Sequence, residues 1–582
     1  MMVVKSLGMV PGEGHMGNVH VIQARVCPPF VAASGPGVLI VNTIQSHPRP
    51  MLRAACLFAV ILLPAAHLHA VDFIPIMSVP DNTSAWSDYN FDGFPDLFAG
   101  TTFLTNNYHI DPNTPFIEHP GAVPGMANTF NTSVGDYNND GNLDIFGYRM
   151  GELGPGGGEL KIATGDGAGN WVDDSAKALP TSVSDDAVNR DHIIVDLNND
   201  GFLDVYITSW VFDWPDNASE SFAPDTDIIY TNNAGNTFSH TWTSPINRYG
   251  KGVVHSDFDR DGDQDVYVSN YWLDQGFLWR NDGFDGSSGL SEQAANYNLY
   301  DGPGHTQGSS FGDFNNDGHQ DLFISNFAHP GNPQLRFMEN QGPAGNYNFT
   351  NRGTGGLRQL EPQNSGIPVD FDNDGDLDIF LTVDAGYGAE KNKLYRNDGN
   401  FTFTNVTRTY ALHDVRQSNQ GANFRAAWGD YDNDGFLDLF ADSRLWKNPG
   451  AQNWPDNHFL KLKLNGGQGA NGLVNQSAIG AQARITIPGL GTLTREVQGG
   501  IGQGMQNDLA LHFGLGTWDQ PVDVEIFWPD GTIQNLLDVD VDQFLAVNIL
   551  DPVTSSAIIP EPRSITLLAA GLILLRPRRR RR

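Results

Sequence analysis

The sequence predicts an all-β fold: a seven-bladed β-propeller followed by a small β-sandwich or barrel domain. The main observation is a nine-residue acidic motif with glycine at its sixth position, which begins at residues 88, 136, 196, 257, 313, 370 and 430. Successive copies lie 48 to 61 residues apart, and such a period indicates a repeat architecture. Each copy is followed by an aliphatic and then an aromatic residue, which favour strands.

Each copy of the motif is typical of a calcium-binding loop. Side-chain oxygens at positions 1, 3, 5 and 9 and the carbonyl oxygen of position 7 are the hard ligands that Ca²⁺ takes at about 2.3 to 2.6 Å. Glycine at position 6 allows the positive φ of a sharp turn. Position 12 is never the bidentate Glu of an EF-hand, so the loop is of another kind.

The predicted ligands belong to seven sites of five residues each. They are Asp88, Asn90, Asp92, Phe94 and Asp96; Asp136, Asn138, Asp140, Asn142 and Asp144; Asp196, Asn198, Asp200, Phe202 and Asp204; Asp257, Asp259, Asp261, Asp263 and Asp265; Asp313, Asn315, Asp317, His319 and Asp321; Asp370, Asp372, Asp374, Asp376 and Asp378; and Asp430, Asp432, Asp434, Phe436 and Asp438.

Residues 71–453 are expected to form the propeller, with four strands in each repeat. An apolar stretch precedes the loop, and a second hairpin with turn residues such as LYRNDG follows it, so that sheet edges are protected by radial packing. The last repeat lacks a fourth strand. Residues 71–79 (VDFIPIMSV) are expected to supply that strand and to close the ring.

The repeats resemble the FG-GAP/VCBS repeats of integrin α-subunit propellers and of many bacterial surface proteins. The resemblance covers roughly 380 residues. It implies up to seven Ca²⁺ ions, held by the residues given above. Asn replaces Asp at position 3 in four copies, which removes a charge and is expected to weaken those sites.

Residues 454–550 lack the acidic motif and show six stretches with strand-like alternation. The phrases SAIGA, REV, LHFGLG and WPDG, which begin at residues 477, 495, 511 and 528, resemble the ASPIC/UnbV domain. That resemblance implies an architecture and no particular chemistry. Residues 551–559 are expected to be a linker.

Both ends of the chain resemble targeting segments. Residues 1–70 are expected to be an N-terminal extension and a secretory signal peptide, with Met51 as the start of translation. Cys27 and Cys56 precede the expected cleavage point, which excludes a disulfide or a thiol nucleophile from the mature chain.

At the other end, residues 560–582 combine Pro-Glu-Pro, a short apolar run and six arginines. They resemble the PEP-CTERM sorting signal of Gram-negative bacteria. This resemblance implies processing by an exosortase-type enzyme, a transient membrane association and a final place outside the cell or on its surface.

The formal net charge of −34 argues against nucleic acid as a partner. Seven bound Ca²⁺ ions would neutralise much of this negative charge, because 24 of the acidic side chains are proposed ligands.

No catalytic residue is predicted. Gly308-Ser309-Ser310-Phe311-Gly312 matches the nucleophile-elbow pattern, but a calcium loop rather than a helix follows it. His512 is expected to be packed in a strand. The tryptophans are expected to pack between blades, and Trp210, Trp214 and Trp272 are the candidates for a ligand surface.

The sequence therefore predicts a secreted, calcium-stabilised binding or adhesion protein of the bacterial surface or extracellular matrix. Its expected ligand is a polysaccharide or a surface protein. The alternatives are a polysaccharide lyase or hydrolase built on a calcium-binding propeller, and a purely structural matrix component.

Overall fold

The computed structural model forms two compact units, Met1–His69 and the chain from Ala70 onwards. It describes residues 39–41, 59–61, 70–79, 84–99, 101–127, 129–149, 159–178, 188–213, 221–224, 226–271, 273–300, 302, 304–327, 334–358, 363–383, 391–412 and 425–550. In the first unit, β1 (Leu39–Val41) pairs with β2 (Ala59–Ile61). The rest of the expected signal peptide and the expected sorting signal at 560–582 lie outside the described residues.

The described residues from Ala70 onwards form an all-β fold, and the first part of them forms seven sheets, each built on four strands that run outwards from the centre. The first three sheets are blade 1, β4 (Ser84–Ser87), β5 (Asp96–Ala99), β6 (Thr102–Asn106) and β7 (Phe116–His119); blade 2, β8 (Thr129–Gly135), β9 (Asp144–Arg149), β10 (Glu159–Gly165) and β11 (Trp171–Asp173); and blade 3, β12 (Val188–Val195), β13 (Asp204–Asp213), β15 (Ile228–Asn232) and β16 (Phe238–Thr243), with β14 (Ser221–Pro224) added to β13.

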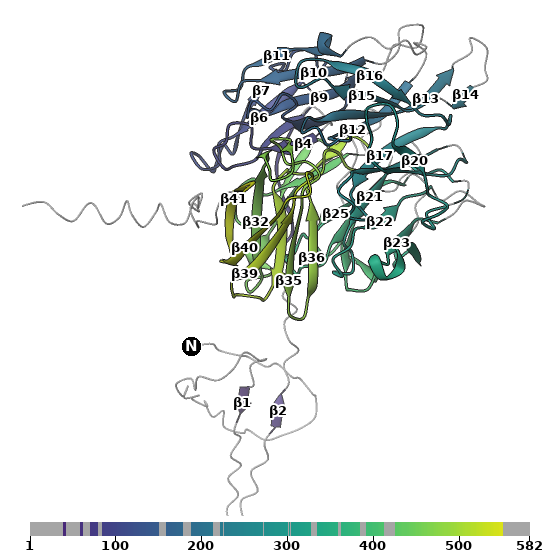
Figure 1. Cartoon of the computed structure of the whole chain (residues 1–582). Coiled ribbons are helices and arrows are strands. Elements are labelled where there is room, and N and C mark those ends of the chain that lie inside the picture. Colours follow the sequence, from purple (N-terminus) through teal and green to yellow (C-terminus); the bar gives the residue numbers. More distant parts are fainter. Residues whose placement is uncertain are drawn as a thin grey trace, which may run out of the picture. The chain divides into compact units, whose positions relative to one another are not determined.

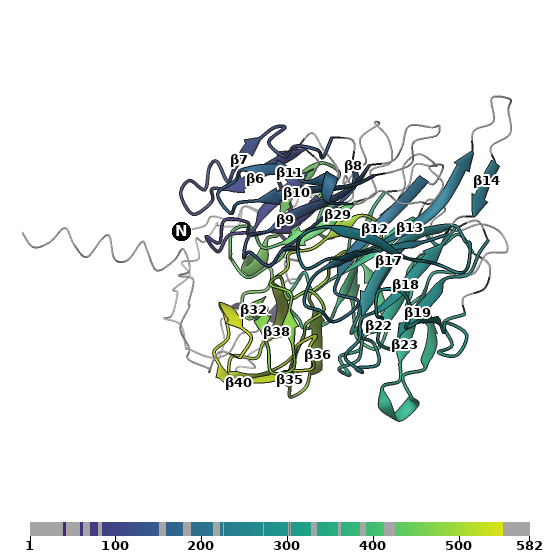
Figure 2. The same cartoon turned by 45° about the horizontal axis from the view of Figure 1, so that its top comes forward.

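The other four sheets repeat this plan, and their order along the chain follows the colours from teal to green in Figures 1 and 2. They are blade 4, β17 (Gly250–Ser256), β18 (Asp265–Asn270), β19 (Phe277–Asn281) and β20 (Leu290–Glu292); blade 5, β21 (Ser309–Gly312), β22 (Asp321–Ile324), β23 (Arg336–Asn340) and β24 (Phe349–Gly353); blade 6, β25 (Gln363–Val369), β26 (Asp378–Val383), β27 (Lys393–Asn397) and β28 (Phe403–Asn405); and blade 7, β29 (Ala426–Gly429), β30 (Asp438–Ala441), β31 (Arg444–Lys447) and β3 (Ile74–Ser78).

The blades form a closed ring. Their innermost strands neighbour one another in the order β4, β8, β12, β17, β21, β25 and β29, and β29 returns to β4. Within the described residues, helix is limited to short 3-10 segments, which include Ser175–Lys177, Pro343–Gly345 and Gly450–Gln452. No helix in this part of the chain is long and apolar enough to cross a membrane.

The N-terminal strand closes the ring as the sequence predicts. β3 pairs antiparallel with β31, so blade 7 combines the first strand of the propeller with three strands from its end. Phe73 and Val79, on either side of β3, are each only 2% exposed. Phe73 packs edge-on against Trp428 of β29, with ring centroids 6.3 Å apart.

Deletion of residues 71–79 is expected to lower the melting temperature by roughly 10 °C. Burial of a large apolar side chain contributes about 1.5 to 3 kcal/mol, and the deletion removes two such side chains together with the edge strand of blade 7. Thermal unfolding followed by circular dichroism measures the effect. Ile74→Thr, at an exposed position of the same strand, is the control and should change little. An unchanged melting temperature after the deletion would show that this closure does not stabilise the ring.

The C-terminal part is a sandwich of two sheets. One consists of β38 (Leu511–Gly516), β32 (His458–Asn465) and β41 (Gln543–Asn548), and the other of β36 (Gly491–Glu496), β35 (Gln482–Ile487), β39 (Val522–Phe527) and β40 (Ile533–Val539). β40 was not among the six predicted strands, although its residues alternate between buried and exposed. Two short strands, β33 (Gly467–Gln468) and β34 (Leu473–Val474), form a separate hairpin.

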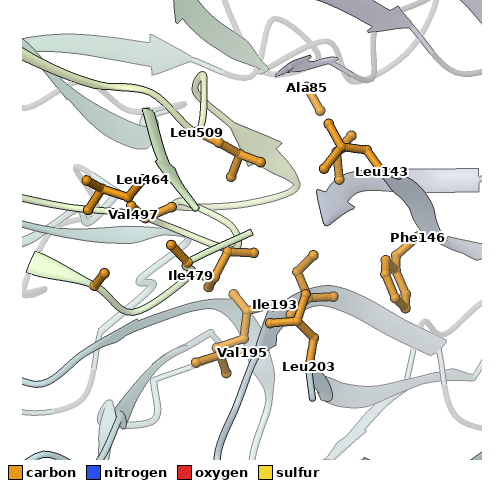
Figure 3. Close-up of a cluster of buried hydrophobic side chains, with 14 of the residues drawn as sticks. Ala85, Leu143, Phe146, Ile193, Val195, Leu203, Leu464, Ile479, Val497 and Leu509 are labelled. Atoms are coloured by element: carbon orange, nitrogen blue, oxygen red, sulfur yellow. The ribbon is translucent and has the colours of Figure 1, made fainter. Parts of the chain in front are cut away.

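This sandwich shares a hydrophobic core with the propeller. Figure 3 shows Ala85, Leu143 and Ile193 of blades 1, 2 and 3 facing Ile479 and Leu509 of the sandwich. All five side chains are at most 4% exposed. The propeller and the sandwich therefore belong to one compact unit and are not two domains on a flexible linker.

A glycine-rich segment of the sandwich, residues 498–508, enters the centre of the ring; we name it the axial loop. Its strand β37 (Met505–Gln506) pairs in parallel with β4, the innermost strand of blade 1. The Gln506 side chain exchanges two hydrogen bonds with the backbone of Val134 in blade 2, at 2.6 and 3.0 Å. The Gly504 N–H donates to Asp191 of blade 3 at 2.9 Å.

The axial loop also reaches the remaining blades. The Gly499 N–H donates to His255 Nε2 of blade 4 at 2.9 Å. Gly502 lies against Gly308 and Ser365, at the starts of blades 5 and 6. The Trp428 N–H of blade 7 donates to Asn507 Oδ1 at 3.0 Å. A single loop thus contacts all seven blades, and it fixes the sandwich to the axis of the propeller.

Candidate metal centres

The seven acidic loops share one hydrogen-bonded geometry. In each, the position 1 aspartate accepts the N–H of the glycine at position 6, and the position 5 aspartate accepts the N–H of position 7. The seven glycines have φ between +86° and +98°. These bonds gather the carboxylates of positions 1 and 5 on the inside of the turn, where the sequence predicts the metal.

The aspartate at position 9 ties the loop to the third strand of its blade. One of its oxygens accepts the N–H of the last residue of that strand in six blades, and of Asn448, directly after β31, in blade 7. In six blades this residue is a buried asparagine, and its Nδ2 makes two hydrogen bonds. It donates to the carbonyl oxygen of position 8 in the loop of its own blade and to the carbonyl oxygen of position 2 in the loop of the preceding blade. The six residues are Asn106, Asn232, Asn281, Asn340, Asn397 and Asn448. This inter-blade contact was not predicted, because the Asn of turns such as LYRNDG was interpreted only as a turn residue.

Position 4 makes a second inter-blade contact, which was not predicted from the sequence. Its residue has φ between +53° and +59° in all seven loops, a region that Asn tolerates better than most residues. In six loops its side chain donates to the next loop; the donors are Asn139, Asn199, Arg260, Asn316, Asn373 and Asn433, and Asn433 of blade 7 reaches Gly93 of blade 1. The Asn that recurs at position 4 is the feature of the sequence from which this contact could have been predicted.

The junction between blades 1 and 2 is built differently. Position 4 of the first loop is Phe91, which cannot donate such a bond, and Gly165 takes the place of the buried asparagine of blade 2. Trp171 of blade 2 instead packs against Tyr89, Phe98 and Phe103 of blade 1, with ring centroids 5.5 to 6.1 Å apart. Aromatic packing therefore replaces the two hydrogen bonds at this junction.

Three loops bring three carboxylate groups together, with one oxygen of each within 4.8 Å of the others. The groups are Asp257, Asp259 and Asp265; Asp370, Asp372 and Asp374; and Asp430, Asp432 and Asp438. Several of their buried oxygens accept no hydrogen bond from any described residue: Asp259 Oδ1, Asp265 Oδ2, Asp370 Oδ1 and Asp372 Oδ1. Buried carboxylate oxygens without a donor are costly unless a cation meets them, so these clusters can hold metal ions.

Burial raises the pKa of these carboxyl groups when no cation is bound. Desolvation raises the pKa of Asp88 and Asp257 to about 7, and the neighbouring carboxylates add to the effect. The pKa of Asp370 is raised to about 8 for the same reasons. A bound divalent cation would stabilise the ionised form and remove this cost.

We expect the metal-depleted protein to become less stable as the pH rises from about 4 to about 7. In this window the unfolded carboxyl groups have lost their protons, whereas folded groups such as Asp88 and Asp257 still hold theirs, so the free energy of unfolding falls with pH. Melting temperatures at pH 5 and pH 7.5, in buffer freed of divalent cations by a chelating resin, measure this trend. A higher melting temperature at pH 7.5 would contradict it.

The residue at position 3 is matched by a residue on the third strand of the same blade. Where position 3 is Asp, that partner is basic: Asp259 with Arg280, Asp372 with Arg396, and Asp432 with Lys447. Where position 3 is Asn, the partner is Thr105, Thr164 or Thr231, or in blade 5 Glu339, which Arg352 neutralises. Arg280 Nε lies 2.8 Å from Asp259 Oδ2, and Lys447 contacts Asp432.

This pairing changes the interpretation of the Asn-containing loops. At positions 1, 3, 5 and 9, with these partners included, each loop carries the net charge of three carboxylates. The fourth and sixth loops have a further carboxylate at position 7, Asp263 and Asp376. The loss of a carboxylate at Asn90, Asn138 or Asn198 is therefore accompanied by the absence of a base on the third strand. The expectation that these sites are weaker stays a prediction.

A double-mutant cycle at the fourth loop tests the pairing. We expect Asp259→Asn alone to weaken metal binding at this site about tenfold, and Arg280→Thr alone to lower stability at low metal concentration, because one partner loses its counter-charge. The double variant reproduces the neutral pair of blades 1 to 3 and should recover most of the wild-type behaviour. Metal titrations followed by thermal unfolding give the readout. Purely additive effects in the double variant would contradict the pairing.

The sandwich lies against the loops and supplies donors to their carboxylates. Lys461, which is 2% exposed, places its Nζ 3.2 Å from Asp430 Oδ2 and 2.9 Å from Asn433 Oδ1. The Thr494 N–H donates to Asp313 and the Gly514 N–H to Asp370, both at 3.1 Å. The alternating lysines of HFLKLKL could have predicted such a contact, because a lysine in a buried strand requires an acidic or polar partner.

Other residues singled out in the sequence have structural surroundings. Ser309 and Ser310 are buried in β21, and Ser310 Oγ donates to the Gly366 carbonyl at 2.9 Å. His512 is buried, and its Nε2 lies 3.0 Å from the Gly435 carbonyl oxygen. The side chain of Trp210 and the whole of Trp214 and Trp272 lie outside the described residues. Trp242, Trp279, Trp428 and Trp446 are buried, as blade packing predicts.

The fold and the loops define a seven-bladed propeller with repeated acidic loops able to hold metal ions. Comparison with family models finds the FG-GAP-like repeat at residues 257–324 and 370–441, and the ASPIC and UnbV domain at residues 472–552. The chain thus contains FG-GAP-like repeats and an ASPIC/UnbV domain, as the sequence resemblance implied.

Curated relatives include cartilage acidic protein 1 of Xenopus tropicalis, 27% identical over 296 residues, which are 50% of this chain and 43% of that protein. The Homo sapiens protein of the same name is 27% identical over 295 residues, 48% of this chain and 41% of that protein. The chain therefore spans less than half the length of these relatives.

Solved structures that are similar to this chain include the following two. One is an Agrocybe aegerita protein described as recognising non-reducing terminal N-acetylglucosamine, with a TM-score of 0.36, 15% identity and coverage of 63% of this chain and 85% of that chain. The other is a Bacillus licheniformis rhamnogalacturonan lyase, with a TM-score of 0.32, 10% identity and coverage of 84% and 78%.

Proposed function

We propose that this chain is a secreted binding or adhesion protein of the bacterial surface or extracellular matrix, whose propeller is stabilised by calcium. Seven loops of the same geometry present oxygen ligands only, which suits the hard cation Ca²⁺. The observation that supports a metal most directly is the set of buried carboxylate oxygens without donors in the fourth and sixth loops. The ion would supply positive charge where the blades meet and would take no part in chemistry.

The ligand that we propose is a polysaccharide or a surface protein. The FG-GAP-like repeats and the similarity to cartilage acidic protein 1 support a binding or adhesion role. The signal-like segment at residues 51–70 and the sorting-like segment at 560–582 support export and processing by an exosortase-type enzyme at the inner membrane.

A binding screen on residues 71–555 tests the proposal. The protein is applied to glycan arrays and to surface extracts of Gram-negative bacteria, with calcium and after its removal. We expect saturable binding that requires calcium. Shortening of a polysaccharide during the same incubation would indicate the alternative, a lyase or hydrolase. Absence of saturable binding would instead favour a purely structural matrix component.

A further inference from the structure

The fourth and sixth acidic loops have the same predicted ligands and the same arginine on the third strand of the blade. Aspartate occupies positions 1, 3, 5, 7 and 9 of both loops. The third strand ends in Arg-Asn and is followed by Asp-Gly in both blades, with Arg280 in blade 4 and Arg396 in blade 6. The ligand set therefore does not explain a difference between the positions of these two arginines.

In blade 4 the arginine lies on the loop. Arg280 Nε is 2.8 Å from Asp259 Oδ2, and Arg280 Nη2 is 2.6 Å from Asp261 Oδ2. Its Nη1 contacts Asp282, which follows the strand. One guanidinium group thus bridges the carboxylates of positions 3 and 5, and two oxygens of the predicted metal site already have a cationic partner.

In blade 6 the arginine is turned away from the loop. Arg396 donates to Asp398 Oδ1 from Nε at 2.9 Å and from Nη2 at 2.5 Å. Among the described residues, Arg396 forms no ion pair with a carboxylate of its loop. The Arg396 side chain is 39% exposed, compared with 21% for Arg280. Positions 3 and 5 of the sixth loop are therefore left without this cationic partner.

Neighbouring side chains account for the two positions of the arginine. In blade 6, Thr404 lies opposite the arginine across the strand pair and donates its hydroxyl to Asp398 Oδ2. In blade 4, Ser291 occupies the same place, and its hydroxyl accepts a hydrogen bond from Gln293 at 3.1 Å. The Asp398 side chain is 30% exposed and the Asp282 side chain 53%. Asp398 is therefore the better fixed partner for an arginine.

The groups of close carboxylates follow the same division. In the sixth loop, the three carboxylates with oxygens within 4.8 Å of one another include position 5, Asp374. In the fourth and seventh loops the third member of the group is the aspartate of position 9. In both of these loops a base, Arg280 or Lys447, contacts the aspartate of position 5. A base on the loop is thus accompanied by a different grouping of the predicted metal ligands.

A second arginine, Arg495 of the sandwich, lies near the sixth loop. Its Nη2 is 4.0 Å from Asp370 Oδ2, and its guanidinium group donates to the carbonyl oxygens of Gly375, Thr494 and His512. Arg495 adds positive charge to the surroundings of the loop, but its hydrogen bonds go to the backbone. It therefore does not take the place of Arg280 on the carboxylates.

We propose that Asp398 makes the sixth loop a tighter calcium site than the fourth, because it holds Arg396 away from the carboxylates of positions 3 and 5. In the fourth loop Arg280 is a tethered cation, which neutralises these carboxylates in the absence of metal and repels an incoming calcium ion. This inference rests on the calcium stabilisation proposed above and adds an order in which the sites fill. Asp398 is a positioning residue that acts through the arginine.

Hydrogen–deuterium exchange of the full chain, measured by mass spectrometry while calcium is titrated into the metal-depleted protein, resolves the two sites. Peptides that cover residues 257–265 and 370–378 report the calcium concentration at which each loop becomes protected from exchange. We expect the midpoint for 370–378 to lie about tenfold below the midpoint for 257–265, because only the fourth loop gives up charge-assisted hydrogen bonds when it binds the ion.

Variants of the arginines and of Asp398 test the cause of this difference. Arg280→Met, which keeps the stem and removes the donors, should lower the midpoint of the fourth loop about tenfold. Asp398→Ala releases Arg396 and should raise the midpoint of the sixth loop by a similar factor. The double variant Asp398→Ala/Arg396→Met should restore the wild-type midpoint of the sixth loop, since the aspartate acts through the arginine.

Asp285→Ala is the control, at an exposed aspartate in a turn of blade 4, and it should change neither midpoint. Slow exchange in the buried strands confirms that each variant remains folded.

Equal midpoints for the two loops of the wild type, or a sixth-loop midpoint that Asp398→Ala leaves unchanged, would overturn the inference and leave the structural role of calcium intact. A double variant that binds as weakly as Asp398→Ala would show that the aspartate acts on the loop directly, which also contradicts the inference. If calcium protects no loop of the wild-type chain, the proposed calcium stabilisation fails as well.

Discussion

Removal of calcium is expected to lower the free energy of unfolding by about 10 kcal/mol. If each of the seven sites binds at about 10⁻⁴ M and free calcium is near 10⁻³ M, each contributes roughly 1.4 kcal/mol to the folded state. The sum is comparable to the whole stability of a typical domain, about 5 to 15 kcal/mol. Without calcium, the carboxylates of the loops lose their counter-charge, and the blades lose the ions that stabilise them.

Denaturant unfolding at neutral pH, with 1 mM calcium and after exchange into metal-free buffer, measures this difference. Magnesium at the same ionic strength is the control, because it demands near-ideal octahedral geometry and keeps several waters, and it should restore little stability. Equal midpoints with and without calcium would refute the structural role that we assign to the ion.

Insertion of a single methyl group at Gly499 is expected to have the second large effect. A Cβ at this position would lie 1.7 Å from the Ile194 carbonyl oxygen of β12, a backbone atom that cannot move aside. Gly499→Ala therefore has to displace the axial loop, with loss of the bonds to His255 and to Ile194. Overpacking of this kind costs about 1 to 3 kcal/mol, and the lost hydrogen bonds add to it.

Gly472→Ala is the matched control for this substitution. The same methyl group at Gly472, in the hairpin of β33 and β34, meets its nearest neighbour at 3.6 Å, an ordinary contact distance. Thermal unfolding and limited proteolysis near residues 450–457 should distinguish the two variants, because a displaced axial loop exposes the connection between propeller and sandwich. Equal stability of both variants would show that the axial loop does not hold the two parts together.

The sequence placed candidate ligand residues in the variable loops after the acidic strands, because those segments differ between repeats. Trp214 and Trp272 of that group lie outside the described residues. In the structure, the sandwich lies against the acidic loops, where Lys461, Thr494 and Gly514 contact their carboxylates. The local sequence of the loops does not predict this cover.

Much of the fold could be predicted because the repeat encodes it locally. The glycine at position 6, the acidic positions and the strand residues that follow lie within a dozen residues of one another, and seven copies made the pattern unambiguous. The closing strand could also be predicted, because the last repeat lacked a fourth strand and the apolar segment 71–79 belonged to no other repeat. The β40 strand was not predicted because the polarity of its residues does not follow their burial: Ile533 and Leu537 are exposed, whereas Gln534 is buried.

The sequence by itself determined the acidic loops, the number of blades and the strand that closes the ring, since these follow from contacts between near neighbours or from counting. Only the tertiary structure decided which side chains join the blades, how Asp259 and Arg280 share their charge, and how the axial loop reaches all seven blades. Those contacts join residues tens to hundreds of positions apart, and no local preference reports them. Burial of the loops under the sandwich gives these distant contacts their importance, because a carboxylate or a base removed from water requires a partner.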